Sequence, residues 1–120
     1  MSHINFEMRS CIEECQSCHR VCLETVTHCL QKGGRHAESA HIRLLLDCVD
    51  ICQTSASFML RGSDLHPLTC SVCAEVCERC AQDCERLADD DMMKRCAEAC
   101  HRCAQSCRRM AGQQGMARAA

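Results

Sequence analysis

The sequence has almost no aromatic residues. It contains no Trp and no Tyr, and Phe6 and Phe58 are its two phenylalanines. Proteins that bind single-stranded nucleic acid stack bases on aromatic side chains, and those that bind duplexes carry clustered basic residues. Here the net charge is −2, with positive and negative residues interspersed along the chain. The composition therefore argues against a nucleic-acid-binding protein.

The chain is also poor in helix-breaking residues and in long apolar runs. One Pro and five Gly in 120 residues leave room for long uninterrupted helices. No stretch approaches the roughly 20 apolar residues that span a bilayer. At the N-terminus, no basic segment is followed by an apolar one, so we expect no secretory leader. We therefore expect a single cytoplasmic domain, in a compartment where thiols stay reduced.

Ordinary core residues are scarce as well. Leu, Ile, Val and Phe together make up about a sixth of the chain, below the roughly 20% at which disorder becomes plausible. What the sequence has instead is 16 Cys. These cysteines must contribute to the interior, as small apolar groups, as cross-links or as metal ligands.

The few turn-forming residues divide the chain into four helical segments. The glycines at 33–34 suit a helix C-terminus, residues 62–67 combine a glycine, N-cap candidates and a first-turn proline, and the aspartates at 89–91 offer an N-cap. Short connections imply antiparallel neighbours. We predict an all-α fold, an antiparallel up-down-up-down four-helix bundle over residues 1–111, with a flexible tail over 112–120. The expected helices cover about 3–31, 37–61, 65–88 and 91–110.

Cysteines recur at helical spacing in every segment. Within a segment, neighbouring cysteines are 3, 4 or 7 residues apart, the spacing that keeps side chains on one face of a helix. Each helix thus presents one cysteine stripe, and together the stripes predict a cysteine-lined core. The stripes comprise Cys11, Cys15, Cys18, Cys22, Cys29, Cys48, Cys52, Cys70, Cys73, Cys77, Cys80, Cys84, Cys96, Cys100, Cys103 and Cys107.

These stripes suit a soft metal ion. Residues at i and i+4 have Cβ atoms about 5–6 Å apart, and two thiolates on one ion span about 4.5 Å, so a helical C-x-x-x-C pair can clamp one Cu(I). Seven such pairs leave Cys29 and Cys70 for bridges between helices. Zinc prefers a closed tetrahedral set, whereas rows of thiolates favour a low-coordinate soft ion. We predict multiple Cu(I), approaching about one per cysteine because thiolates can bridge two metals.

Methionines and histidines at the bundle ends are further candidate ligands. Antiparallel helices would gather Met8, Met59, His66 and Met110 at one end, and His41 and Met93 at the other, beside Cys29 and Cys96. We expect copper to enter at the end with Met8, Met59 and Met110. The alternative is that these are ordinary core residues.

Two further sets of residues complete the expectations. On the helix expected over residues 37–61, inward positions where further metal ligands would be expected are occupied by His41, Leu45 and Ser55. We expect solvated surface positions for the histidines at 3, 19, 28, 36 and 101, and an N-cap role for the aspartates at 89–91.

Other readings of the cysteines remain open. They include a metal-free core, a disulfide scaffold, a thiol-based redox buffer, a C-x-x-C redox enzyme, and a zinc- or iron–sulfur-dependent structural or regulatory module. At four ligands each, sixteen cysteines would hold at most about four zinc ions. No inward set of Ser, His and Asp and no carboxylate pair argues for catalysis, so we do not expect an enzyme.

The sequence through about residue 110 resembles the cytosolic branch of the copper storage protein family. The resemblance rests on the repeated C-x-x-x-C helices, on the run Cys15-Gln16-Ser17-Cys18-His19, on the segment from Cys96 to His101, and on the absence of a leader. It implies a four-helix bundle with a cysteine-filled core, storage of many Cu(I) with all sixteen cysteines as ligands, and a homotetramer. A copper chaperone or a copper-requiring enzyme is the candidate exchange partner.

Overall fold

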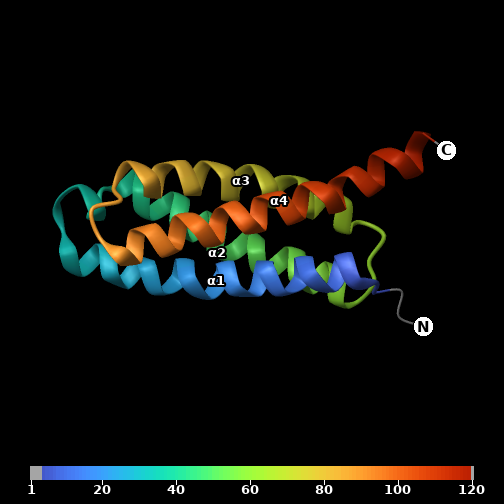
Figure 1. Cartoon of the computed structure of the whole chain (residues 1–120), viewed down its shortest axis with the longest axis horizontal. Helices are drawn as coiled ribbons and strands as arrows, with labels where there is room; N and C mark the ends of the chain where they lie inside the picture. Colours follow the sequence, from blue (N-terminus) through green and yellow to red (C-terminus); the bar gives the residue numbers. More distant parts are fainter. Residues whose placement is uncertain (1–3, 120) are drawn as a thin grey trace.

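The computed structural model describes residues 4–119, and the side chains of residues 4–112. Four long helices lie side by side along one axis (Figure 1). They are α1 (Phe6–Lys32), α2 (Ser39–Leu60), α3 (His66–Arg86) and α4 (Asp91–Ala119), with a 3₁₀ turn, η1 (Gly34–Ala37), between α1 and α2.

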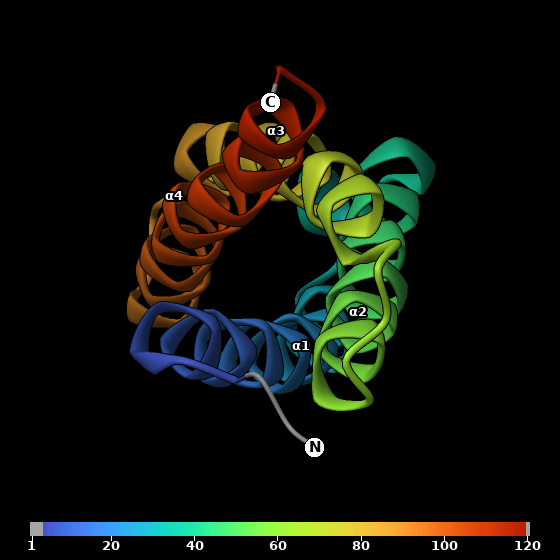
Figure 2. The same cartoon turned by 90° about the vertical axis from the view of Figure 1, so that its right-hand side faces the viewer.

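The helices surround a central axis in chain order. Figure 2 looks along this axis and shows one helix on each side of it. α1 packs against α2 and α4, and α3 packs against the same two helices. Short connections make sequential neighbours antiparallel. The predicted all-α antiparallel four-helix bundle is confirmed, and its inner faces form one continuous core.

Local chemistry explains where the helices begin. The side-chain oxygen of Asn5 accepts a hydrogen bond from the Met8 backbone N–H at 2.8 Å, which caps α1. Asp90 does the same for the Met93 N–H at 2.9 Å at the start of α4, so the capping role predicted for the aspartates at 89–91 is confirmed. Pro67 occupies the first turn of α3, where its missing N–H costs nothing.

The C-terminal segment differs from the prediction. The spacing of the cysteines predicted an end of the last helix at residue 110, whereas α4 continues to Ala119 and projects beyond the other helices (Figure 1). The segment contains no proline and is rich in Ala, Gln, Arg and Met, which are good helix formers, so two glycines do not suffice to end the helix. The flexibility predicted for residues 112–120 stays a prediction.

Polarity is sharply divided between inside and outside. Among the residues whose side chains are described, no Lys, Arg, Asp or Glu is buried. The two aromatic rings stay out of the core: Phe6 is 85% exposed and Phe58 lies under the Arg61 guanidinium. None of the helices, over the part of the chain that the structure describes, has a stretch apolar enough to cross a bilayer. Cysteine, methionine and alanine therefore make up most of the interior.

Candidate metal centre

All sixteen cysteines are free thiols in the bundle interior. Each has a relative exposure of at most 1%. This follows from the spacing of 3, 4 and 7 residues, which puts every cysteine of a helix on the face that packs inward. The thiols form a column along the axis, and the predicted cysteine-lined core is confirmed.

Neighbouring sulfurs lie at distances that a metal ion can bridge. Within one helix, the Sγ atoms are 3.8 Å apart for Cys18 and Cys22, and 4.0 Å apart for Cys48 and Cys52. Between helices, Cys48 Sγ lies 3.6 Å from Cys77 Sγ. Metal–sulfur bonds of about 2.3 Å place sulfurs about 3.8–4.0 Å apart in tetrahedral or trigonal sites and about 4.6 Å apart in linear ones. The observed spacing therefore suits three- or four-coordinate sites with little movement, more than the two-coordinate clamp expected from the sequence.

The thiols form overlapping groups rather than isolated sites. Four sets of four cysteines have all their sulfurs within 4.8 Å of one another, and a further set has three. Members are shared: Cys18 and Cys48 belong to two sets, and so do Cys52 and Cys77. Such sharing requires sulfurs that bridge two ions. Five of the sets are Cys15/Cys73/Cys103/Cys107, Cys18/Cys22/Cys48/Cys100, Cys18/Cys48/Cys52/Cys77, Cys52/Cys73/Cys77/Cys103 and Cys11/Cys70/Cys107.

Among the residues whose side chains are described, no Lys, Arg, Asp or Glu is buried beside the thiols to balance a thiolate. Burial, together with the nearby Cys96 and Asp90, raises the pKa of Cys29 to about 11. Without a metal this thiol is neutral at pH 7, because an isolated thiolate in a low-dielectric interior is costly. A bound cation supplies the missing positive charge and displaces the proton.

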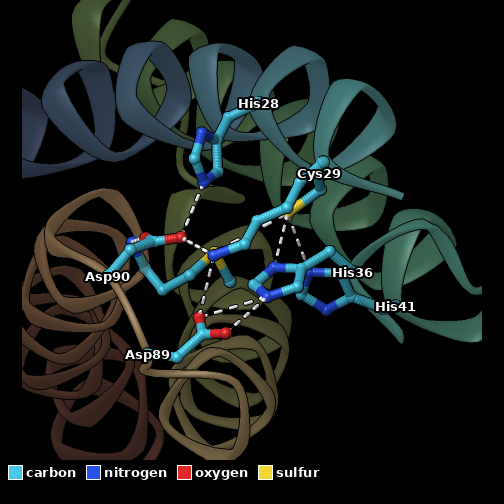
Figure 3. Close-up of polar contacts among 8 residues, drawn as sticks. His28, Cys29, His36, His41, Asp89 and Asp90 are labelled. Carbon is cyan, nitrogen blue, oxygen red and sulfur yellow. Dashed lines mark hydrogen bonds and ion pairs between the residues drawn. The ribbon is translucent and has the colours of Figure 1, made fainter. Parts of the chain in front are cut away.

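At the end of the thiol column near the α1–α2 and α3–α4 connections, imidazole and thioether groups lie beside the last cysteine thiol. Cys29 Sγ lies 3.3 Å from His41 Nε2 and 3.6 Å from Met93 Sδ. His36 Nδ1 is 3.8 Å from the same sulfur. Figure 3 shows both imidazole rings turned toward Cys29. One thiol, two imidazoles and a thioether thus meet at this end, and we call them the Cys29 cluster.

Carboxylates hold both rings of the Cys29 cluster from outside. His41 Nδ1–H donates to Asp83 Oδ2 at 2.6 Å, which leaves Nε2 free to face the sulfur. His36 Nε2 lies 3.2 Å from an Asp89 oxygen, and Nδ1 again faces inward. Although burial acts to raise the pKa of Asp83, the hydrogen bond from His41 and the contacts with Arg86 lower it below its usual value. Asp83 is therefore ionised at neutral pH and favours this tautomer of His41.

Salt bridges close the same end (Figure 3). Lys32 Nζ lies 2.6 Å from Asp90 Oδ2 and 3.3 Å from Asp89 Oδ1, and His28 Nε2 lies 3.0 Å from Asp90 Oδ2. The hydrogen bond from Lys32 is the main cause of a lowered pKa at Asp90. These contacts tie the end of α1 to the connection between α3 and α4.

The opposite end carries thioethers. Met8, Met59 and Met110 are buried in the core, and Met59 Sδ lies 3.8 Å from Cys70 Sγ. His66 is half-buried. Its Nδ1 bonds to the Ser63 backbone oxygen at 3.0 Å, and its buried Nε2 has no partner. The predicted placement is confirmed, whereas the ligand roles of these residues stay predictions.

On α2, the three non-cysteine residues predicted for the inward stripe are buried as expected: His41, Leu45 and Ser55 are at most 2% exposed. Ser55 Oγ has no hydrogen-bond partner.

Part of the Cys29 cluster was not predicted from the sequence. His36 was expected on the solvated surface but is buried, 6% exposed. Gly33, with a φ of 75° and a ψ of −165°, reverses the chain after α1 and lets η1 return His36 to the core. Helical periodicity carries no signal for a residue in such a turn. Asp83 was missed too, and its position directly before Cys84 was the available hint. His3 lies outside the described residues.

Comparison with known proteins gives one family. The description that matches residues 4–112 is that of the copper storage proteins. The cysteine-rich protein YhjQ of Bacillus subtilis is 38% identical over 67 residues, which are 56% of this chain and 62% of that protein. The chain thus spans less than two thirds of this relative.

Solved structures agree over most of the chain. The Nmul_A1745 protein of Nitrosospira multiformis is 45% identical, with a TM-score of 0.85 over 89% of this chain and 96% of that one. The Cu(I)-bound copper storage protein BsCsp3, from Bacillus subtilis, is 37% identical, with a TM-score of 0.82 over 88% and 98%. A cytosolic copper storage protein from Streptomyces lividans, loaded with five coppers, is 30% identical, with a TM-score of 0.77 over 88% and 92%.

Proposed function

The chain belongs to the copper storage protein family, and from this premise we propose that it stores many Cu(I) ions on the thiolates inside its bundle. The observation that carries the proposal is the column of sixteen buried thiols with sulfur–sulfur contacts between 3.6 and 4.0 Å. Thiolate is the protein ligand that Cu(I) prefers. With no charged side chain buried among the described residues, the metal itself neutralises the thiolates.

The overlap of the thiol sets supports storage over a structural zinc module. Isolated tetrahedral sites need four ligands each, and sets that share Cys18, Cys48, Cys52 and Cys77 cannot all be filled in that way. Bridging thiolates remove this conflict, because one sulfur then serves two ions. We propose all sixteen cysteines as ligands, at about one Cu(I) per cysteine.

A Cu(I) titration of the reduced protein under anaerobic conditions tests this function. The ultraviolet thiolate-to-copper bands rise against a low background, because Trp and Tyr are absent. Storage predicts saturation far above four Cu(I) per chain and retention against a competing chelator. Saturation at about four ions, or a preference for zinc, would favour the structural module instead. Thiol–disulfide activity without any metal would favour the redox buffer.

We also propose a cytoplasmic location and a homotetramer, with a copper chaperone or a copper-requiring enzyme as exchange partner. Free thiols persist in a reducing compartment, and the Streptomyces relative is described as cytosolic. Exposed apolar side chains, among them Leu23, Leu60 and Leu65, support an assembly. Light scattering of the purified protein tests the assembly, and cell fractionation tests the location.

A further inference from the structure

Ser106, in the middle of α4, is a buried polar residue whose side chain the helix does not satisfy. It is 2% exposed, and among the described residues its hydroxyl has no hydrogen-bond partner. A buried hydroxyl in a helix commonly donates to the backbone oxygen four residues earlier, as Thr25 does to Val21 at 2.7 Å. Ser106 makes no such bond. Its burial therefore costs free energy in the metal-free protein, and a role in the metal-loaded protein would account for that cost.

Ser106 lies at the end of the thiol column that carries the thioethers. The Sγ atom of its neighbour Cys107 is 3.7 Å from Cys11 Sγ. The pKa of Cys11 is lowered chiefly by hydrogen bonds from neighbouring thiols, Cys107 first, while burial opposes this effect; the Ser106 hydroxyl lowers the pKa further. A donor that lowers the pKa of a thiol acts on its thiolate. The hydroxyl is therefore placed to interact with a Cys11 thiolate.

The thiols at this end form a set with excess negative charge. Of the five sets named above, four hold four cysteines, whereas the set of Cys11, Cys70 and Cys107 holds three. Three thiolates carry more negative charge than one Cu(I) balances. Sharing of Cys107 with the neighbouring set spreads part of this charge. Because no Lys or Arg is buried among the described side chains, a hydrogen-bond donor is the remaining way to stabilise it.

We propose that Ser106 is a positioning residue of the copper store: its hydroxyl donates a hydrogen bond to the Cys11 thiolate once Cu(I) has bound to the three-thiol set. The inference rests on the proposed storage function. Binding of Cu(I) displaces the Cys11 proton to the buffer. A protonated thiol is a weak acceptor, so the hydroxyl lacks a partner before loading, whereas a charged thiolate accepts a much stronger bond. The contact thus contributes to copper binding and not to folding of the metal-free chain.

A crystal structure of the Cu(I)-loaded protein, prepared without oxygen, tests the contact directly. We expect Ser106 Oγ within hydrogen-bond distance of Cys11 Sγ, and a Cu(I) ion on the same sulfur. A hydroxyl that donates instead to the backbone oxygen of Arg102, four residues earlier, would overturn the proposal. Because this experiment uses the unmodified protein, it does not depend on whether a variant folds.

Ser106→Ala gives a second readout, in which folding and copper binding change in opposite directions. The metal-free variant should unfold at an equal or higher denaturant concentration, because it loses a buried hydroxyl without a partner. In the loaded variant, about one Cu(I) should pass to a competing chelator at a concentration about 10-fold lower, because a hydrogen bond to a charged group is lost. A merely structural role would lower the stability of the metal-free protein and leave the chelator titration unchanged.

Ser55→Ala is the matched control, because it removes the other buried hydroxyl that the described part of the chain shows without a partner. Its metal-free form should also keep or gain stability, while its chelator titration should stay at the wild-type value. Equal loss of copper from both variants would mean that any hydroxyl at this end has the same effect, and the specific contact with Cys11 would be wrong.

The outcomes separate this inference from the storage function. If the ultraviolet bands of the wild-type protein saturate far above four Cu(I) per chain, and Ser106→Ala releases copper like the wild type, the role of Ser106 is wrong and storage stands. If the bands fail to develop in the wild type, the storage function is wrong, and the role of Ser106 fails with it.

Discussion

At the scale of single residues, Cys52 is one of the most connected positions of the thiol column, as are Cys48 and Cys103. Its Sγ lies 3.6–4.0 Å from the sulfurs of four other cysteines: Cys77, Cys73, Cys103 and Cys48. A thiolate in this position can bridge two ions, whereas Cys29 faces imidazole and thioether donors. We predict that Cys52→Ser lowers the Cu(I) capacity by about two and Cys29→Ser by about one. Native mass spectrometry of the loaded variants measures both, and equal losses would argue against bridging by Cys52.

Adding a thiol at position 55 should raise the copper capacity, just as removing one should lower it. The buried hydroxyl of Ser55 has no partner, which costs roughly 1–3 kcal/mol. Ser55→Cys removes that cost and adds a thiol to the inward stripe of α2. We expect the metal-free protein to gain about 1 kcal/mol in the free energy of unfolding, and the capacity to rise by about one Cu(I).

Chemical denaturation and the Cu(I) titration check the two effects of Ser55→Cys separately. Ser71→Cys is the matched control, because Ser71 is exposed on α3. Its capacity should stay at the wild-type value. A rise in both variants would mean that copper binds to any added thiol, wherever it lies.

At the scale of the elements, the connection after α1 depends on the backbone of Gly33. With a φ of 75° and a ψ of −165°, this residue lies in a region that is essentially restricted to glycine, although nothing lies within 4 Å of an added Cβ. Gly33→Ala should therefore destabilise the protein by about 1–3 kcal/mol through backbone strain. Thermal unfolding measures the loss.

The same substitution should disturb the position of His36, because Gly33 lies in the turn that returns this ring to Cys29. Gly112→Ala is the control: this glycine lies in the helix, where alanine is favoured by up to about 1 kcal/mol. A variant Gly33→Ala with unchanged melting temperature would show that the connection adapts at no cost.

The inward faces of the helices could be predicted from the sequence. The position of His36 and the end of α4 could not, for physical reasons. Spacings of 3, 4 and 7 residues fix the inward face of a helix, so the cysteine stripes and the burial of Leu45 and Ser55 followed from periodicity. His36 did not, because its position depends on a glycine-mediated reversal outside any helix. The predicted end of α4 was wrong because composition alone does not show that the helix continues through the two glycines at 112 and 115.

At the scale of the whole molecule, the buried thiol of Cys29 links stability to pH. Burial raises the pKa of Cys29 from 9.0 to about 11. A group whose pKa is higher in the folded state stabilises that state below its unfolded pKa, and this contribution is lost as the pH rises through the folded value. The metal-free protein should thus lose stability between about pH 9 and 11.

Circular dichroism during denaturant titrations at pH 7, 9 and 11 measures this loss. The Cu(I)-loaded protein is the control, because its sulfurs are already deprotonated and balanced by metal. We expect its unfolding to depend much less on pH. Equal alkaline sensitivity of both forms would place the cause in surface groups instead of the thiols.

The axial position of the thiols has one more consequence. The bundle measures 50 × 25 × 20 Å, and every cysteine faces its centre line. Filling the store would add electron-dense atoms along this line without widening the outline of the protein. Small-angle X-ray scattering should therefore record a cross-sectional radius of gyration that falls as copper is added, while the maximum dimension stays constant. A full store would look thinner to X-rays than an empty one.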